Sequence, residues 1–285
     1  DVILATPVVA ELARIYPTAQ IDFLLRKGNE VLLKNNPHIH RLLVLEKKAG
    51  KIKSLRTLLS QIRAEKYDEV INLHRFASTG ILTAFSGAKS RVGFNKNPFS
   101  FAYTQKIDHV LDNRHEVARN LACIQHHGAV GLRRPELFPT EADFRTVQPY
   151  TTTPFYCLAP ASVWFTKQLP EEKWVELANK LSLSGKVYLV GGPGDTDLCE
   201  RIRQQTTQNV ENIAGKHSLM ESAALMSQAV RNYVNDSGPM HICSAMNAPV
   251  TVFFCSTVPK FGFGPLSQDA IIQETPLNLA CRPCG

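Results

Sequence analysis

Strand-like and helix-like segments alternate along most of this 285-residue chain, and this alternation limits its fold more than any other feature. Short apolar runs predict strands at 20–25, 68–73, 155–159, 186–190, 211–215, 232–235 and 249–254. Helical spacing of apolar residues predicts helices at 2–16, 51–66, 170–183, 195–205 and 239–246, and near 77–86 and 114–127. Ser218 and Glu221 form a capping box that opens one more helix. Such alternation indicates βαβ units, and we predict an α/β fold of two Rossmann-like domains whose parallel sheets face a cleft.

Residues 129–154 interrupt the alternation with a polar run that contains several Gly and Pro residues. We predict a linker there, which divides the chain into domains at 1–150 and 151–285. The chain opens on Asp1 without an initiator Met and stops just after Cys284. We therefore expect it to be a piece of a longer chain.

Composition excludes several classes of protein. Apolar residues make up 44% and charged residues 20%, which argues against a disordered chain. No apolar run approaches the roughly 18 residues of a membrane-spanning helix, and no signal peptide is recognisable at the start. Seven scattered cysteines indicate free thiols in a reducing compartment rather than a disulfide scaffold.

Positive charge is concentrated in the first domain. Residues 1–150 carry 22 Lys and Arg against 14 Asp and Glu, whereas residues 151–285 carry 10 against 11. This asymmetry favours an anionic partner such as a phosphorylated lipid, a membrane surface or nucleic acid, although a solvated basic face would give the same counts. Residues at strand ends or helix starts are the candidates for contact with that partner: Arg75, Arg91, Lys96 and Arg119.

Ligands of open parallel sheets bind beyond the carboxyl ends of the strands, so the loops there hold the candidate site. The loop 160–170 contains Ser162 and Lys167, and a lysine suits a phosphate as a point charge. The turn 191–195 brings Gly191 and Gly192 next to Asp195, and its backbone N–H groups could approach a phosphate or ribose. A solvated lysine and a turn built for packing alone remain the alternatives.

The loop after strand 232–235 is the most informative of the three. Asp236 or Ser237 can cap the helix that Pro239 begins, and a helix N-terminus at the end of a parallel strand is an anion site. Gly238 would let a ligand approach closely, and His241 could donate to a phosphate or a sugar hydroxyl. Asp236 could otherwise serve as a cap alone.

The remaining motifs give weaker evidence of function. Cys281 and Cys284 form half of a zinc site at most, and we expect no metal to be held within this chain. The sequence lacks the HExxH, GxSxG and P-loop patterns, so it offers little support for hydrolases or for metal-dependent nucleotide chemistry.

Several segments resemble, in the same order, the motifs of glycosyltransferase family 9, the heptosyltransferases. The similar segments are DVILATPVVAELARIYPTAQIDFLLRKG at the start, HEVARN, PASVWFTKQLPEEKW, LVGGPGD, NIAGKHSLMESAALMSQA, NDSGPMHICSAMNAP and CSTVPKFGFGPLS. Two differences stand out. The Gly and the strand that precede the family's catalytic Asp are not in the chain, and VWFTKQLP departs from a Trp-Ser-Lys-x-Trp-Pro pattern, which leaves the donor sugar open.

The resemblance implies a GT-B architecture with an N-terminal acceptor domain and a C-terminal nucleotide-sugar domain. It implies an inverting transfer that needs neither metal nor cofactor, of heptose from ADP-heptose onto the lipopolysaccharide inner core. The enzyme would be cytoplasmic and peripheral at the inner membrane, and its partner an anionic glycolipid rather than nucleic acid. Asp1 stands at the place of the family's general base. The donor-site residues of the family correspond to Ser162, Lys167, Asp236, Ser237, Gly238 and His241, and less closely to Asp195.

Three alternatives stay open. The enzyme could transfer another nucleotide-activated sugar. A nicotinamide-dependent oxidoreductase could share the sheet, but the chain lacks GxGxxG and the acidic residue that follows about 20 positions later. A nucleic-acid-binding protein could use the basic half, but no nucleic-acid module is recognisable.

Overall fold

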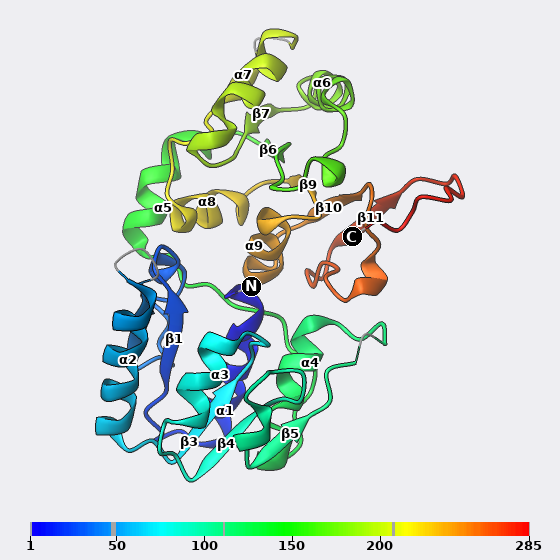
Figure 1. Cartoon of the computed structure of the whole chain (residues 1–285). Helices are drawn as coiled ribbons and strands as arrows, with labels where there is room; N and C mark the ends of the chain where they lie inside the picture. The colour runs from blue at the N-terminus through cyan, green and yellow to red at the C-terminus, as the bar shows by residue number, and fades with distance from the viewer. Residues whose placement is uncertain (1, 47–49, 111, 207–208, 285) are drawn as a thin grey trace. The chain divides into compact units, whose positions relative to one another are not determined.

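The computed structural model describes residues 2–46, 50–110, 112–206 and 209–284. The chain divides into two compact units, Asp1–Arg133 and Arg134–Gly285 (Figure 1). The division falls inside the expected linker but earlier than residue 150, because α5 (Glu141–Val147) packs against α8 (Leu219–Met226) of the second unit. Thr140 and Asp143 form the capping box that begins α5, so the Pro-rich segment contains a helix that was not expected.

The first unit builds two parallel sheets from its described residues. β1 (Asp22–Arg26) pairs with β2 (Arg41–Leu45), and β3 (Glu69–Asn72), β4 (Ser90–Phe94) and β5 (Gln105–Ile107) pair in that order. Its helices are α1 (Thr6–Ile15), α2 (Lys51–Glu65), α3 (Ala77–Ala84) and α4 (Glu116–Ala122), with 3₁₀ turns η1 (Ile3–Ala5) and η4 (Gln125–His127) beside α1 and α4. Leu58 and Ile62 of α2 pack on Leu45 of β2 and Leu82 of α3, so one apolar cluster joins the β1–β2 sheet to these two helices.

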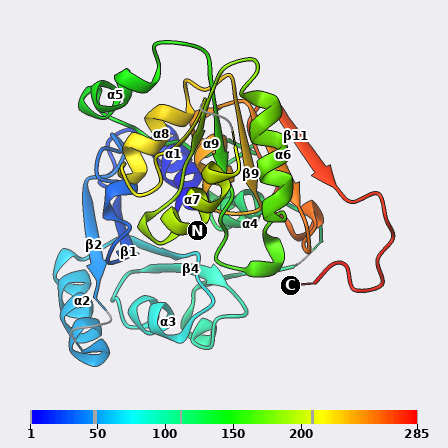
Figure 2. The ribbon, with the colours of Figure 1, turned by 90° about the horizontal axis from the view of Figure 1, so that it is seen from above.

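The second unit is a doubly wound sheet of six parallel strands, in the order β11-β10-β9-β6-β7-β8. The strands are β6 (Phe155–Ala159), β7 (Lys186–Leu189), β8 (Val210–Asn212), β9 (Arg231–Asn235), β10 (Val250–Phe254) and β11 (Ala270–Glu274). The chain runs outward from β6 to β8, returns to β9 beside β6, and runs outward again to β11 at the opposite edge. Figure 2 shows β11 at that edge, to the right of β9. The crevice of such a sheet lies between β6 and β9, where the winding direction reverses.

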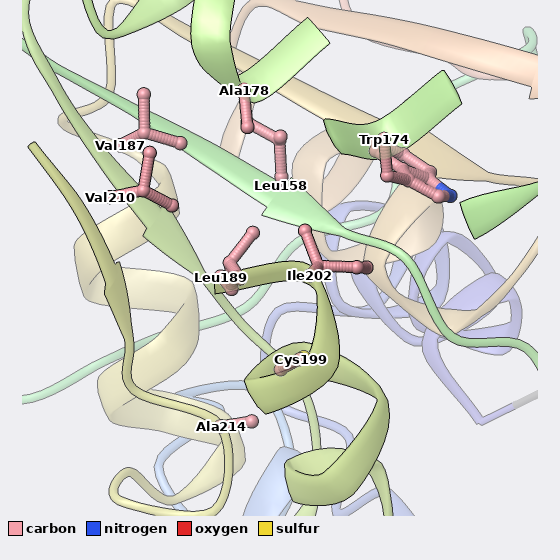
Figure 3. Packing of buried hydrophobic residues seen from close by; sticks show 9 residues of the cluster. All are labelled: Leu158, Trp174, Ala178, Val187, Leu189, Cys199, Ile202, Val210 and Ala214. Atoms are coloured by element: carbon pink, nitrogen blue, oxygen red, sulfur yellow. The ribbon is translucent and has the colours of Figure 1, made fainter. Parts of the chain in front are cut away.

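Helices cover both faces of this sheet. α6 (Glu171–Leu181) and α7 (Thr196–Gln204) lie on one face, and α8 and α9 (Gly238–Met246) lie on the other (Figure 1). Trp174 and Ile202, from α6 and α7, pack on Leu158 and Leu189 of the strands beneath them (Figure 3). Each fully buried aliphatic side chain contributes about 1.5–3 kcal/mol, so this core holds the strand ends in fixed positions.

In the parts of the chain that the structure covers, no helix is both long enough and apolar enough to span a bilayer.

Candidate functional site

A buried amide organises the crevice between β6 and β9. Asn235 is the last residue of β9 and is fully buried. Its side-chain Nδ2 donates to the carbonyl of Pro160 at 2.8 Å, and its Oδ1 accepts from the backbone N–H of Leu169 at 3.0 Å. Both ends of the loop 160–170 are therefore fastened to the carboxyl end of β9.

Lys167 and Asp236 meet across this crevice. The Lys167 Nζ lies 2.7 Å from the Asp236 Oδ2, and the Thr257 hydroxyl donates to the same oxygen at 2.7 Å. The Asp236 side chain is 7% exposed and that of Lys167 is 25% exposed. The loops after β6, β9 and β10 thus converge on one carboxylate. An ammonium group has three N–H donors, so Lys167 can bind an anion without leaving Asp236.

The N-terminus of α9 lies directly after Asp236. The helix begins at Gly238, one residue before the expected start, and Ser237 occupies the N-cap position. The Ser237 hydroxyl donates to the Asn235 carbonyl at 3.3 Å instead of capping the helix. Apart from its chain neighbours and the backbone of its own helix, no heavy atom lies within 4 Å of the point where a Gly238 Cβ would be, so this end of the helix has room for a ligand. His241 follows, half-buried, in the first turn.

The turn after β7 is held by its own carboxylate. The backbone N–H of Gly192 donates to the Asp195 Oδ2 at 2.8 Å. A Cβ on Gly191 would lie 2.8 Å from the Asp195 Cβ, so this tight turn requires glycine. The contacts with the Asp195 carboxylate give Gly191 and Asp195 a structural role in the turn.

In the loop after β6, the Ser162 carbonyl accepts from the Gln168 Nε2 at 2.8 Å.

The C-terminal segment supports the loop that follows β10. Arg282, between Cys281 and Cys284, donates to the carbonyls of Cys255 and Thr257, each at 2.9 Å. It therefore positions the loop that carries Thr257. Both thiols of the pair are exposed and free, and in the described part of the chain they belong to no group of three metal-binding side chains.

The candidate residues of the first unit separate into two groups. Arg75 and Lys96 are exposed, in the loops that follow β3 and β4. The buried Asn97 joins these loops, because its Nδ2 donates to the carbonyls of His74 and Phe76 at 3.0 and 3.1 Å. Arg75 and Lys96 are therefore presented at one edge of the sheet.

Arg91 and Arg119 make contacts within the first unit. The Arg91 guanidinium donates to the carbonyls of Ala88 and Ala102. Arg119 is 2% exposed, and its Nε lies 2.7 Å from a Glu116 carboxylate oxygen. Burial lowers the pKa of the nearby His109, and the charge of Arg75 lowers it further.

Asp1, the expected general base, lies outside the described residues.

Three residues of the site were not singled out from the sequence: Asn235, Thr257 and Arg282. Asn235 and Thr257 lie within NDSGPMHICSAMNAP and CSTVPKFGFGPLS, so family similarity contained a signal for both. Arg282 lies between Cys281 and Cys284, and no sequence pattern marks it as a site residue.

Known proteins are similar to this chain along most of its length. Residues 55–284 match the family model described as glycosyltransferase family 9 (heptosyltransferase). Lipopolysaccharide heptosyltransferase 3 of Escherichia coli K12 is 27% identical over an alignment of 277 positions, and the match covers 90% of this chain and 80% of that protein.

Solved structures agree on the fold. The glycosyl transferase family 9 protein of Veillonella parvula DSM 2008 has a TM-score of 0.89 at 25% identity, covering 96% of this chain and 82% of that chain. The E. coli ADP-heptose LPS heptosyltransferase II has a TM-score of 0.84 at 22% identity, covering 96% and 86%. The expected α/β class with parallel sheets is confirmed.

Proposed function

The chain belongs to glycosyltransferase family 9, and from this membership we propose that it transfers heptose from ADP-heptose to the lipopolysaccharide inner core. The names of its relatives support the sugar and the acceptor. The main support for the donor site is that Lys167, Asp236 and the N-terminus of α9 lie together between β6 and β9, where the winding of the sheet reverses.

The donor diphosphate binds at this point. Lys167 supplies a positive charge, and the N-terminus of α9 supplies backbone N–H groups and the positive end of the helix dipole. Ser237 and His241 lie beside that end and contact the phosphate or the sugar, while Gly238 leaves space for them. Asp236 positions the Lys167 ammonium. The neighbouring turn with Gly191, Gly192 and Asp195 faces the ribose.

The transfer is a single displacement. The acceptor hydroxyl oxygen attacks the anomeric carbon from the side opposite ADP, and its proton passes to the carboxylate of Asp1. The bond between the anomeric carbon and the phosphate oxygen breaks, and ADP leaves with the bonding electrons. One displacement inverts the anomeric configuration. A positioned base contributes about 10²–10⁴-fold to the rate. The role of Asp1 rests on family similarity.

Lys167 and the helix end replace a metal ion in stabilising the leaving diphosphate. Asp195 and Asp197 have the spacing of a DxD metal motif, but the Asp195 Oδ2 already accepts from Gly192. Because these positive groups, Lys167 and the helix end, lie at the proposed diphosphate site, we infer a reaction that proceeds without a divalent metal.

The test is a transfer assay with purified enzyme, ADP-heptose and lipopolysaccharide truncated in its inner core. We expect one heptose to be added, with the anomeric configuration opposite to that of the donor by NMR, and unchanged initial rates in EDTA. UDP-glucose and ADP-glucose serve as control donors. A retained configuration, a faster rate with either control donor, or a rate that EDTA abolishes and Mg²⁺ restores would each contradict the corresponding part of the proposal.

The acceptor contacts the basic first unit through Arg75 and Lys96 at the cytoplasmic face of the membrane. Arg75→Ala and Lys96→Ala should raise the KM for lipopolysaccharide without raising the KM for ADP-heptose. The effect should shrink as salt rises, because exposed charges are screened. Lys53→Ala, on the exposed side of α2, is the matched control. An acceptor KM that is the same in all four proteins would remove these residues from the acceptor site.

A further inference from the structure

Two adjacent imidazoles converge on one carboxylate in the first unit. The Nε2 of His126 lies 2.9 Å from the Glu69 Oε1, and the Nε2 of His127 lies 2.6 Å from the Glu69 Oε2. The ring centroids of the two histidines are 3.9 Å apart. The three side chains are between 16% and 25% exposed, so solvent still reaches the cluster.

Neighbouring groups hold these side chains in place. The Ser90 hydroxyl donates to the Glu69 Oε1 at 2.6 Å, and the Tyr16 hydroxyl lies 3.0 Å from the His127 Nδ1. Burial raises the pKa of the Glu69 carboxyl, but hydrogen bonds from Ser90 and the two histidines outweigh it and bring the pKa below its ordinary value. Glu69 is therefore ionised at neutral pH.

The cluster lies at the edge of the sheet opposite the candidate acceptor residues. Glu69 and Ser90 are the first residues of β3 and β4 and are paired in register. Arg75 and Lys96 follow the other ends of the same strands. The cluster thus has no part in the proposed transfer, and the inference from it is independent of that proposal.

We propose that Glu69, His126 and His127 form a binding site for a transition-metal dication of the Zn²⁺ class. Two imidazoles and one carboxylate are a ligand set that zinc uses, with a water in the fourth position. The ligand atoms of the three residues all lie within 4.8 Å of one another. The metal takes the place of the hydrogen bonds between the two Nε2 atoms and the carboxylate, and each neutral imidazole then carries its proton on Nδ1.

The nitrogen–oxygen distances of the cluster fit a tetrahedral zinc ion after a small movement of the side chains. Zinc–ligand bonds of about 2.0–2.2 Å in a tetrahedron place the ligand atoms about 3.4 Å apart. The present nitrogen–oxygen distances of 2.9 and 2.6 Å must therefore open by less than about 1 Å, which side-chain rotation can supply. Tyr16 then orients His127 through its second nitrogen, as outer partners of metal-bound histidines do. The metal would fasten η4 to the starts of β3 and β4.

The test is calorimetric titration of the metal-free full chain with Zn²⁺, in a Cys281→Ser/Cys284→Ser background that removes the competing thiols. We expect one Zn²⁺ per chain, a rise in the unfolding temperature, and the visible absorption of a four-coordinate ion when Co²⁺ is used instead. Glu69→Gln and His126→Ala should weaken Zn²⁺ binding by more than about 100-fold, and Tyr16→Phe by about 10–100-fold. Gln125→Ala, in the same turn, is the matched control and should bind as the parent does.

Circular dichroism and the unfolding temperature of each variant, measured without metal, show whether it has kept its fold. Two results would overturn the proposal: a parent that binds no Zn²⁺ saturably, which leaves a hydrogen-bonded cluster only, or folded Glu69→Gln and His126→Ala variants that bind Zn²⁺ as tightly as the parent.

Discussion

The carboxylate of Asp236 connects residues that are far apart in the sequence. Its Oδ2 accepts from Thr257 and pairs with Lys167, which is 69 positions away. The pair neutralises a nearly buried charge, so its two members cannot be varied independently. An alanine at 167 would remove the proposed phosphate contact and also leave the Asp236 carboxylate without its counter-ion.

A double-variant comparison separates these two effects. Lys167→Ala should weaken ADP binding by about 10- to 100-fold, because one charge-assisted contact contributes about 1.5–3 kcal/mol. Lys167→Ala/Asp236→Asn removes the unpaired charge and should recover stability but not ADP affinity. Lys173→Ala, an exposed position on α6 that pairs with Glu176, is the control. If calorimetry showed ADP affinity restored in the double variant, Lys167 would have a structural role only.

At the scale of elements, one carboxylate joins β1, β2 and the end of α2. Asp22 begins β1 and is paired in register with Arg41 of β2, whose Nη2 lies 2.6 Å from the Asp22 Oδ2. The hydroxyl of Tyr67, just after α2, donates to the same oxygen, and His40 lies at the other. Burial raises the pKa of the Asp22 carboxyl, but the bonds from Tyr67, Arg41 and His40 outweigh it, and the pKa falls below its ordinary value.

The lowered pKa of Asp22 predicts how the stability of β1 and β2 depends on pH. Because the folded-state pKa is lower than the unfolded-state pKa, the contribution of Asp22 is complete above about pH 4 and is lost as pH falls through the folded-state pKa. Asp22→Asn should lower the opening free energy of the β1 and β2 amides at pH 7 by about 1.5–3 kcal/mol. Hydrogen exchange measures that energy. The parent and variant curves should converge in acid, and curves that stay parallel from about pH 7 to pH 3 would contradict the role of Asp22.

At the scale of the whole molecule, the long periodic elements could be predicted from sequence, whereas the contacts between the loops of the candidate site could not. The expected strand at 155–159 is confirmed in full, as is the capping box of Ser218 and Glu221. Strands β2, β4, β5 and β11 were not expected. The apolar run of β2 favours a strand and was missed, whereas polar or charged residues interrupt the apolar residues of β4, β5 and β11. Strand order brings β9 beside β6, so no local pattern could reveal the Lys167–Asp236 pair.

Local pattern also could not separate the four basic residues of the first unit. Arg75, Arg91, Lys96 and Arg119 have similar places relative to the predicted strands and helices. Burial decides between them, because the guanidinium of Arg119 is enclosed beside Glu116 and that of Arg91 is bonded to backbone carbonyls. The exposed pair, Arg75 and Lys96, is left for a partner.

The most direct test of a donor site at the β6/β9 crevice is hydrogen exchange of the full chain with and without ADP, in EDTA. Peptides that cover 160–170 and 235–246 should exchange more slowly with ADP, those that cover the loops after β3 and β4 should not change, and UDP should protect less. Unchanged exchange at both 160–170 and 235–246 under saturating ADP, or protection confined to the first unit, would contradict the proposed site.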